Sequence, residues 1–231
     1  MAISSELRAL VVTRDARLGA SFREISREFG IEAQTSATSG GVPEELRHEK
    51  YEALVVDFDT IADTGPILST LHQSPSNRSA IVLAVATGTE QKEQALSLGA
   101  NFVFARPLEI EHVRVALNTA HSQMVRERRR YFRCPVELSV QLIRANAVVV
   151  SCTTLNLSRS GMAVRSPERF DLGENVDVAF SLQEGASVLA EGTVVWDDRH
   201  EKAGINFTCK NPEMQKMLDS WLGIRFARSL S

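Results

Sequence analysis

Apolar residues follow two different patterns along the chain. Up to about Val125, short apolar runs alternate with segments whose apolar residues recur at the i, i+3, i+4 spacing of a helix. Strands that are apolar at every position are buried on both faces, which requires helices on both sides of a parallel sheet. We therefore predict a (βα)₅ doubly wound domain. Its expected strands are Leu7–Val12, Ile31–Ala33, Ala53–Phe58, Ile81–Ala86 and Phe102–Ala105, and its expected helices are Arg17–Phe29, Pro66–His72, Glu90–Leu98 and Glu109–Val125.

After Arg133 the pattern changes to short strands separated by turn residues. Gly, Asn, Pro, Asp and Ser stand between the apolar segments, and they favour turns, which indicates an antiparallel barrel or sandwich. The last segment, Pro212–Arg225, carries Met, Leu and Trp residues in one stripe and predicts a helix that caps the open end of a barrel. The six expected strands are Val136–Ile143, Val148–Leu157, Met162–Arg165, Val176–Leu182, Ser187–Trp196 and Ala203–Thr208.

The change of pattern divides the chain into domains 1–123 and 124–231. A chain of 231 residues that is 43% apolar can bury the cores of two such domains. No linker rich in Pro, Gly or Ser marks the border. The last helix of the first domain can therefore continue into the segment Met124–Arg133.

Composition restricts the site and the compartment. The net charge of −3 and the pI near 6.0 indicate that any basic site is local, which disfavours a general nucleic-acid coat. The chain shows neither an N-terminal signal pattern nor an apolar stretch long enough for a membrane span, so we expect a cytoplasmic protein. Cys134, Cys152 and Cys209 lie far apart and without metal-ligand spacing, so we expect reduced thiols.

Residues that could carry catalysis are scattered. The five histidines show no spacing typical of a metal site or a catalytic triad. Neither the Gly-x-x-x-x-Gly-Lys-Ser/Thr loop nor the Gly-x-Gly-x-x-Gly fingerprint occurs. We therefore predict that the protein is not an enzyme, has no catalytic residue and binds no metal.

Basic charge is concentrated immediately before the first barrel strand. A planar guanidinium can bind phosphate oxygens in pairs, pair with the edge of guanine and stack on a base. Taken alone, such a run is more often a solvated face or a nucleic-acid patch than a specific ligand site. The arginines are Arg126, Arg128, Arg129, Arg130 and Arg133.

A polar turn, Asn156-Leu-Ser-Arg-Ser-Gly161, stands between two of the expected barrel strands. Its Asn and Ser side chains can face outward, while Gly161 allows a tight turn or the close approach of a ligand. In isolation, an ordinary hairpin stabilised by its own side chains explains this sequence equally well.

The pair Arg129-x-x-x-Arg133, followed by Asn156-x-Ser158-x-x-Gly161, six strands and a closing helix, resembles the PilZ domain, a bacterial receptor for cyclic di-GMP. The resemblance covers roughly residues 126–224 and includes the late strand pair around Trp196 and Phe207.

By this resemblance, Arg129 and Arg133 hold the phosphates and stack on or pair with guanine. Asn156, Ser158 and Gly161 would meet a guanine edge. Many family members have Asp where this chain has Asn156. Asn keeps a hydrogen-bond acceptor but lacks the negative charge of Asp, which best receives guanine N–H groups. Arg128 and Arg130 could each be an auxiliary ligand contact or a solvated charge. Of the two, we include Arg128 among the candidate ligand-binding residues.

The first domain resembles a response-regulator receiver. Asp57 follows the strand Leu54-Val-Val where the family has its phosphoacceptor, and Arg106-Pro107 stands where the family has Lys-Pro, with the peptide bond expected to be cis. The departures concern the chemistry. Thr13 and Arg14 replace the acidic pair that holds Mg²⁺ in the family.

Without a metal, phosphoryl transfer to Asp57 loses its main electrostatic stabilisation. We therefore expect a pseudo-receiver, which contributes a surface for an unidentified protein partner or for a homodimer. Asp59 and Asp63 could rebuild a metal site with Asp57, but Asp residues are also common in loops near strand ends.

The sequence thus favours a cyclic di-GMP receptor that converts ligand binding into altered protein–protein or interdomain contacts. Motility, adhesion or exopolysaccharide secretion would be the regulated process by family resemblance. Two alternatives stay open: a phosphorylation-dependent response regulator with a barrel output domain, and an RNA or DNA binder that uses the arginine segment. The second is disfavoured because no aromatic strand platform accompanies the arginines.

Overall fold

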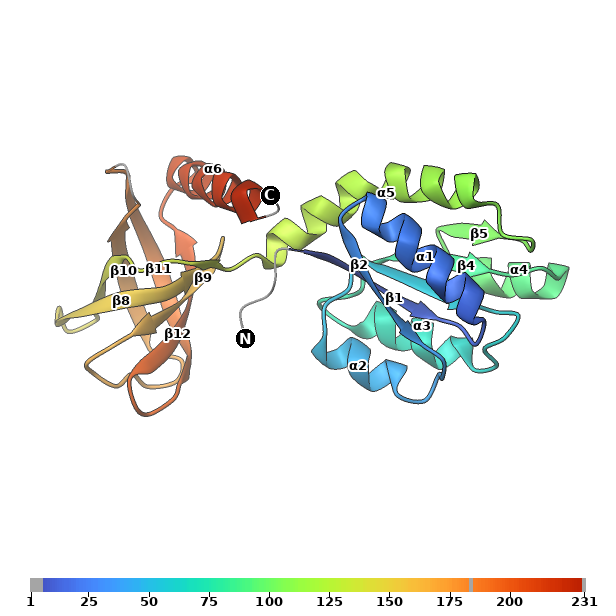
Figure 1. Cartoon of the computed structure of the whole chain (residues 1–231). Coiled ribbons are helices and arrows are strands. Elements are labelled where there is room, and N and C mark those ends of the chain that lie inside the picture. Colours follow the sequence, from blue (N-terminus) through green and yellow to red (C-terminus); the bar gives the residue numbers. More distant parts are fainter. Residues whose placement is uncertain (1–5, 183–184, 230–231) are drawn as a thin grey trace. The chain divides into compact units, whose positions relative to one another are not determined.

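The computed structural model describes residues 6–182 and 185–229. The chain divides into two compact units, Glu6–Arg128 and the part from Arg129 onward, which we call the N-terminal and C-terminal units (Figure 1). Each is described by itself.

The N-terminal unit is a parallel five-stranded sheet with the strand order β2-β1-β3-β4-β5. This is the flavodoxin-like order of a doubly wound α/β fold, as the hydrophobic pattern predicts. The strands are β1 (Leu7–Val12), β2 (Ile31–Ser36), β3 (Ala53–Asp57), β4 (Ile81–Val85) and β5 (Phe102–Phe104), and the helices are α1 (Ala16–Glu28), α2 (Val42–His48), α3 (Thr64–Gln73), α4 (Thr89–Ser97) and α5 (Ile110–Tyr131).

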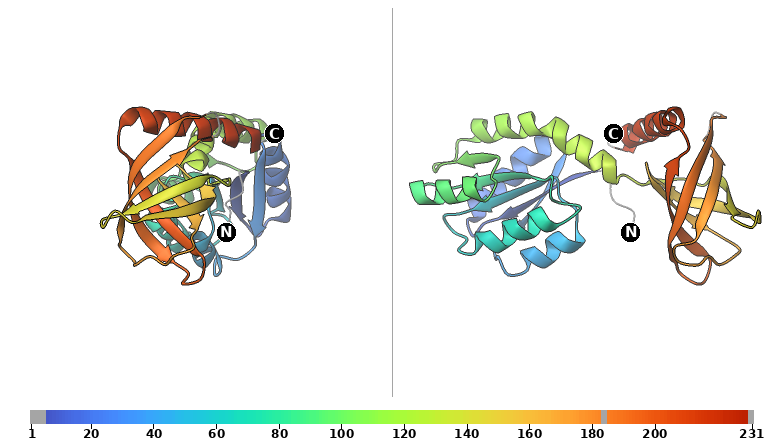
Figure 2. Two further views of the ribbon diagram at one scale, coloured as in Figure 1. Left: turned by 90° about the vertical axis from the view of Figure 1, so that its left-hand side faces the viewer. Right: turned by 180° about the vertical axis from the view of Figure 1, so that it is seen from behind.

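Helices cover both faces of this sheet, and each face has its own apolar core (Figure 2). On one face, residues of α1 and α5 such as Phe22 and Leu117 pack on side chains of the strands. On the other face, residues of α2 and α3 such as Leu46 and Leu68 pack on the alternate side chains. Every residue of β3 and β4 is buried, which explains why these strands are apolar almost without interruption.

Three local features of this unit bear on the sequence predictions. The Arg106–Pro107 peptide bond is cis, as expected. Helix α2 was not predicted, whereas α5 extends past the predicted end at Val125 to Tyr131. The helix thus continues from the N-terminal unit into the first residues of the C-terminal unit.

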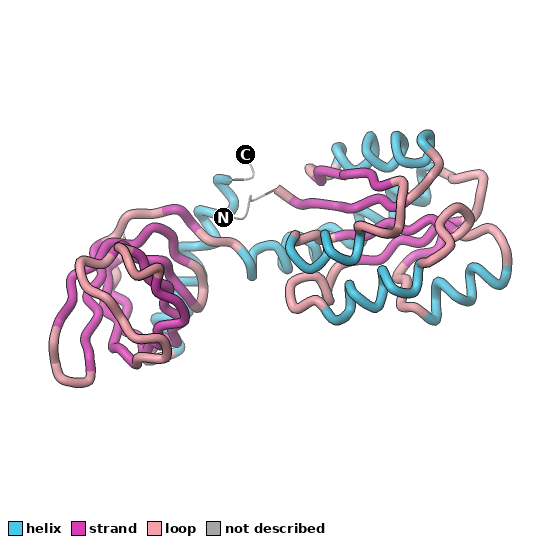
Figure 3. Tube along the Cα trace, turned by 90° about the horizontal axis from the view of Figure 1, so that it is seen from below, coloured by secondary structure: helices cyan, strands magenta, loops and turns pink. Residues whose placement is uncertain are grey.

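The C-terminal unit is a closed antiparallel barrel. Its six long strands pair in the order β8-β7-β10-β11-β12-β9, and a further pairing of β8 with β9 closes the ring (Figure 3). The short β6 pairs with the end of β8 outside this ring. The strands are β6 (Cys134–Pro135), β7 (Ser139–Arg144), β8 (Val149–Leu157), β9 (Gly161–Arg165), β10 (Asn175–Ser181), β11 (Ser187–Asp197) and β12 (Lys202–Cys209).

Alternate residues along the barrel strands are buried, as in Val176, Val178 and Phe180 of β10. Helix α6 (Pro212–Ser229) follows the last strand and packs against β6, β11 and β12. The barrel and its closing helix therefore confirm the predicted fold class. All three cysteines are buried free thiols.

Candidate functional site

The arginine segment and the polar hairpin are neighbours in the structure. Strand β6 runs antiparallel to β8, with Cys134 opposite Leu157 and Pro135 opposite Asn156. Since Arg133 immediately precedes Cys134, this register brings its backbone to the level of Ser158, at the start of the hairpin. The two elements singled out in the sequence thus meet at one edge of the barrel.

The hairpin is a tight turn that depends on glycine. The backbone N–H and the hydroxyl of Ser158 both donate to the carbonyl oxygen of Gly161, at 2.8 and 2.9 Å. Gly161 pairs with Asn206 of β12, and a Cβ atom at position 161 would lie 3.1 Å from the carbonyl oxygen of Ile205. A larger residue would press on this backbone, so Gly161 has a structural role within the turn.

Asn156 carries an unsatisfied acceptor. Its side-chain oxygen Oδ1 is buried, and no hydrogen-bond partner for it exists among the described residues. A buried polar atom without a partner costs about 1–3 kcal/mol, so such atoms usually have a ligand or water to bind. Asn156 lies on β8, opposite Pro135 of β6, the strand that directly follows Arg133.

Arg129 is held by helix α6. Its Nη2 atom donates to the main-chain carbonyl of Asp219 at 2.6 Å. A Cβ atom at Gly223 would lie 2.5 Å from the same nitrogen, so a side chain at position 223 would displace the guanidinium.

The hairpin also contacts α6. The Nε atom of Arg159 lies 3.2 Å from the carboxylate oxygen Oδ1 of Asp219. Gln215 donates to the same carboxylate at 3.0 Å and to the carbonyl of Arg159 at 3.3 Å. Asp219 therefore binds Arg129 of the arginine segment and Arg159 of the hairpin. The sequence pattern did not predict these contacts.

Phe132 anchors the segment between the two arginines. Its ring is buried and meets Phe226 of α6 edge to face, with a centroid distance of 5.1 Å. Arg129 and Arg133 on either side of it are exposed. The arginine segment is thus helical as far as Tyr131, and Phe132 after it packs on α6.

Arg128 is placed differently from Arg129. Its side chain is 1% exposed and lies 3.3 Å from Oε1 of Glu52, which Lys50 also approaches at 3.5 Å. Burial lowers the pKa of both Arg128 and Lys50, and the carboxylate of Glu52 opposes this effect. The Arg128 side chain is therefore engaged in a buried ion pair of the N-terminal unit, and for this reason we leave it out of the candidate ligand site.

A second polar cluster surrounds Arg106 at the carboxyl end of the parallel sheet. The guanidinium contacts Asp15 at 2.7 Å, Asp57 at 2.8 Å and Asp59 at 3.1 Å. These carboxylates raise the pKa of Arg106 against the opposing effect of its burial.

Asp57 is fully buried within this cluster. Its oxygen Oδ2 accepts hydrogen bonds from the hydroxyls of Thr13 and Thr60, at 2.6 and 2.7 Å, in addition to the one from Arg106. Three donors thus converge on one carboxylate oxygen, and a guanidinium supplies the positive charge. Among the described residues, no group of three or more His, Cys, Asp or Glu side chains is arranged to hold a metal ion.

Two partners of this cluster were not predicted. Asp15 caps the N-terminus of α1 by accepting hydrogen bonds from Arg17 and Leu18, and it also binds Arg106. Thr87 donates to Asp59 through both its backbone and its hydroxyl. The residues present therefore fit an internal cation better than Mg²⁺, which requires oxygen ligands with room for several waters.

Within the part of the chain that the structure describes, no helix is both long and apolar enough to cross a membrane.

One family model matches the C-terminal part of the chain. Residues 127–223 match the family described as PilZ domain. No curated protein matches the sequence.

Solved receiver domains resemble the N-terminal part. A CheY-like response regulator receiver domain protein from Methanospirillum hungatei JF-1 is 18% identical over 53% of this chain and 98% of its own, with a TM-score of 0.46. The receiver domain of a sensor histidine kinase from Pseudomonas aeruginosa PAO1 was solved with a magnesium ion in its active site cleft. It is 15% identical over 51% of this chain and 98% of its own, with a TM-score of 0.46. A Francisella response regulator receiver domain is 19% identical over 51% of this chain and 98% of its own, with a TM-score of 0.43.

The flavodoxin-like strand order of the structure itself establishes the fold of the N-terminal unit. Residues 127–223 of this chain are a PilZ domain, and they follow a domain with the receiver fold.

Proposed function

We propose that the C-terminal unit is a receptor for cyclic di-GMP, bound between the arginine segment and the polar hairpin. The observation that carries the proposal is the antiparallel pairing of β6 with β8, which brings Arg133 next to the Asn156–Gly161 turn. Two further observations support it: Arg129 and Arg133 are exposed residues, and the buried oxygen of Asn156 has no hydrogen-bond partner among the described residues.

Each group has a role that fits a cyclic dinucleotide. The arginines bind phosphate oxygens in pairs and stack on or pair with guanine, which a lysine does less well. The free acceptor of Asn156 receives an N–H of a guanine edge. Ser158 already donates to Gly161, so it contributes its acceptor lone pairs, while Gly161 keeps the turn close to the neighbouring strand.

The proposal includes a switch at α6. Arg129 and Arg159 are both bound by Asp219 in the structure. A dianionic ligand competes with the carbonyl of Asp219 for Arg129, because its phosphates offer stronger charge-assisted hydrogen bonds than a main-chain carbonyl. It competes with the Asp219 carboxylate for Arg159 as a second anion. Binding therefore changes how α6 is held, which alters the surface available to other proteins.

The N-terminal unit acts in this proposal as a pseudo-receiver. Asp57 is buried with one oxygen saturated by three donors, and Arg106 takes the place of a metal. Incubation with acetyl phosphate and Mg²⁺, followed by intact-mass analysis, should leave Asp57 unmodified. Stable modification of Asp57 would favour the phosphorylation-dependent alternative.

Calorimetric titration with cyclic di-GMP tests the receptor proposal. We expect saturable binding that Arg129→Ala and Arg133→Ala each weaken by about 10- to 100-fold, as the loss of charge-assisted hydrogen bonds implies. Arg126→Ala is the matched control, because this exposed arginine of α5 lies outside the C-terminal unit. Equal competition by an unrelated single-stranded RNA would refute a cyclic di-GMP receptor and favour a nucleic-acid binder.

A further inference from the structure

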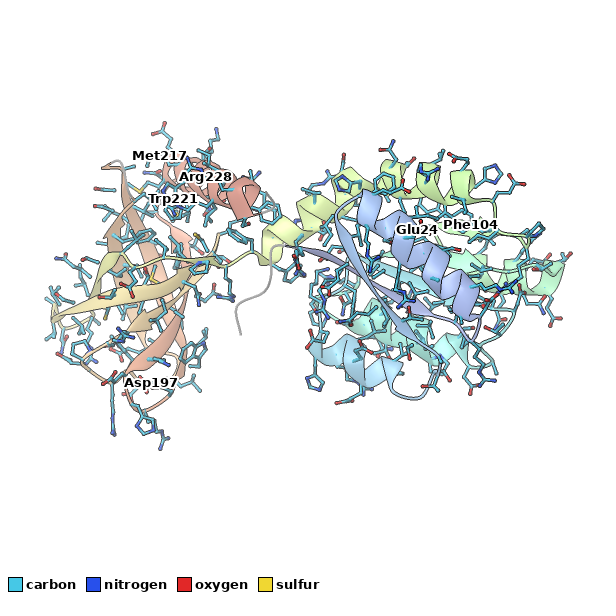
Figure 4. All side chains as sticks on the ribbon, viewed as in Figure 1. Glu24, Phe104, Asp197, Met217, Trp221 and Arg228 are labelled. Atoms are coloured by element: carbon cyan, nitrogen blue, oxygen red, sulfur yellow. The ribbon has the colours of Figure 1, made fainter. Side chains whose placement is uncertain are left out.

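Helix α6 has a second apolar stripe besides the one that packs on the barrel. Leu218, Leu222 and Phe226 are buried. Two other apolar residues of the helix are exposed: Met217 by 39% and Ile224 by 57%. Together with Trp221, they line a groove beside α6. Figure 4 labels Met217 and Trp221 on this helix.

The opposite wall of this groove comes from the barrel. Leu182 directly follows β10 and Ala186 directly precedes β11, and both line a hollow of about 400 Å³. A backbone hydrogen bond from Leu182 to Ala186, of 2.8 Å, fixes the spacing of this wall. The groove is therefore a concave apolar surface with one helical wall and one hairpin wall.

The rim of the groove is basic. Lys216, Arg225 and Arg228 contribute to its lining. The guanidinium of Arg225 lies over the ring of Trp221, with its Cζ atom 4.3 Å from the ring centroid. Apolar side chains and positive charge thus occur together along one face of α6.

We propose that this groove docks an acidic amphipathic helix of a partner protein. Apolar residues of the partner at i, i+3, i+4 and i+7 would fill the hollow along Met217, Trp221 and Ile224, and flanking Asp or Glu side chains would meet the basic rim. The stretch from Met217 to Arg228 extends about 16 Å, which corresponds to three turns of a docked helix.

The shape favours a helix over a membrane. A lipid surface binds apolar side chains that protrude, whereas this apolar surface is hollow and has two walls. The groove shares α6 with the contacts to Arg129 and Arg159, so a partner helix docked here would be sensitive to how α6 is held. The docking itself does not depend on nucleotide binding.

Tryptophan fluorescence provides the test. The chain has two tryptophans, so Trp196→Phe leaves Trp221 as the sole reporter in the groove. The probes are synthetic peptides of about 14 residues with one leucine face: one with glutamates on the flanks, one with lysines in their place and one with the leucines scrambled. We expect the glutamate peptide to shift the Trp221 emission and to bind at least about tenfold more tightly than either control peptide.

Variants locate the binding in full-length protein. Fluorescently labelled glutamate peptide should lose at least about tenfold in affinity with Trp221→Ala and with the pair Lys216→Glu and Arg228→Glu. The matched control is Lys210→Glu, a basic residue of the barrel outside the groove, which should change affinity little. Calorimetry with cyclic di-GMP on the same variants reports the receptor site separately.

Three results would overturn the proposal. Equal binding of the glutamate and lysine peptides would exclude recognition by the basic rim. Sedimentation of a dimer that Trp221→Ala dissociates would assign the groove to a second copy of this chain. Binding to phosphatidylglycerol vesicles that competes with the peptide would assign it to an anionic lipid surface.

Discussion

The guanidinium of Arg129 donates to the main-chain carbonyl of Asp219 at 2.6 Å, while the side-chain carboxylate of Asp219 binds Arg159 at 3.2 Å. One position of α6 therefore holds an arginine from each of the two elements proposed to bind the ligand. Since one contact uses the backbone and the other the side chain, mutation can separate them.

Asp219→Asn should tighten cyclic di-GMP binding by about two- to fivefold. The substitution removes a negative charge close to a dianionic ligand and frees Arg159, but it keeps the carbonyl that holds Arg129. Arg159 is exposed and Asp219 is partly exposed in this ion pair, so we expect the free energy of unfolding to change by less than about 1 kcal/mol. Asp177→Asn, which removes a paired carboxylate from β10, is the control and should leave the affinity unchanged. Weaker binding by Asp219→Asn would contradict competition between α6 and the ligand.

Asn156→Leu should separate stability from binding. The apolar side chain has a similar size and removes a buried oxygen that has no partner among the described residues, so thermal unfolding of the protein without nucleotide should occur at the same temperature or a higher one. Cyclic di-GMP affinity should fall at least about tenfold, because the guanine edge loses its acceptor. A variant that is both destabilised and fully competent to bind would show that Asn156 is only a structural turn residue.

Adjacent arginines should have opposite effects. Arg128→Met breaks a buried ion pair with Glu52 and should destabilise the N-terminal unit by about 3 kcal/mol, with nucleotide affinity preserved in the folded protein. Arg129→Ala should do the reverse, reducing affinity with little change in stability. Both tryptophans, Trp196 and Trp221, lie in the C-terminal unit. Their fluorescence therefore reports the unfolding of that unit, whereas circular dichroism reports the unfolding of both units. Loss of nucleotide affinity in folded Arg128→Met would contradict this assignment and show that Arg128 contributes to ligand binding.

Arg106→Met should destabilise the protein in a pH-dependent way. The backbone N–H of Leu18 and the guanidinium of Arg106 lower the pKa of Asp15. Burial alone would raise the pKa of Asp59, but hydrogen bonds from Thr87 and Arg106 outweigh it and lower the pKa. Groups with a lowered folded pKa stabilise the protein above their unfolded pKa, and this contribution is lost as the pH falls through the folded value.

The effect of Arg106→Met should therefore be about 1–3 kcal/mol at pH 7 and should shrink below about pH 4. Urea unfolding at a series of pH values measures it, and Arg14→Met serves as a control because Arg14 is exposed. A difference in stability between wild type and Arg106→Met that is independent of pH would contradict the role of Asp15 and Asp59.

The sequence predicted most elements because their signals are local. Continuous apolar runs in the parallel sheet and alternating apolar residues in the barrel give strands whose observed bounds lie close to those predicted, as for β1 and β10. Helix α2 was missed because it has only seven residues and buries just Val42 and Leu46. Its helical character depends on packing against the sheet rather than on a repeated pattern.

The candidate site was predictable in part for the same reason. Arg129, Arg133 and the Asn156–Gly161 turn form short motifs, and the pairing of β6 with β8 brings them together. The roles of Asp219, Glu52 and Asp15 depend on contacts between residues far apart in sequence, for which no local spacing gives a signal. Arg128 and Arg129 look equivalent in the sequence, yet successive positions on a helix face different directions.

Backbone amide NMR of the labelled protein during a cyclic di-GMP titration tests the central claim most directly. The account predicts that the largest chemical-shift changes fall in both residues 129–135 and residues 156–161, with smaller changes along α6. Changes confined to only one of these elements, or located in the N-terminal unit alone, would contradict a ligand site shared by the arginine segment and the hairpin.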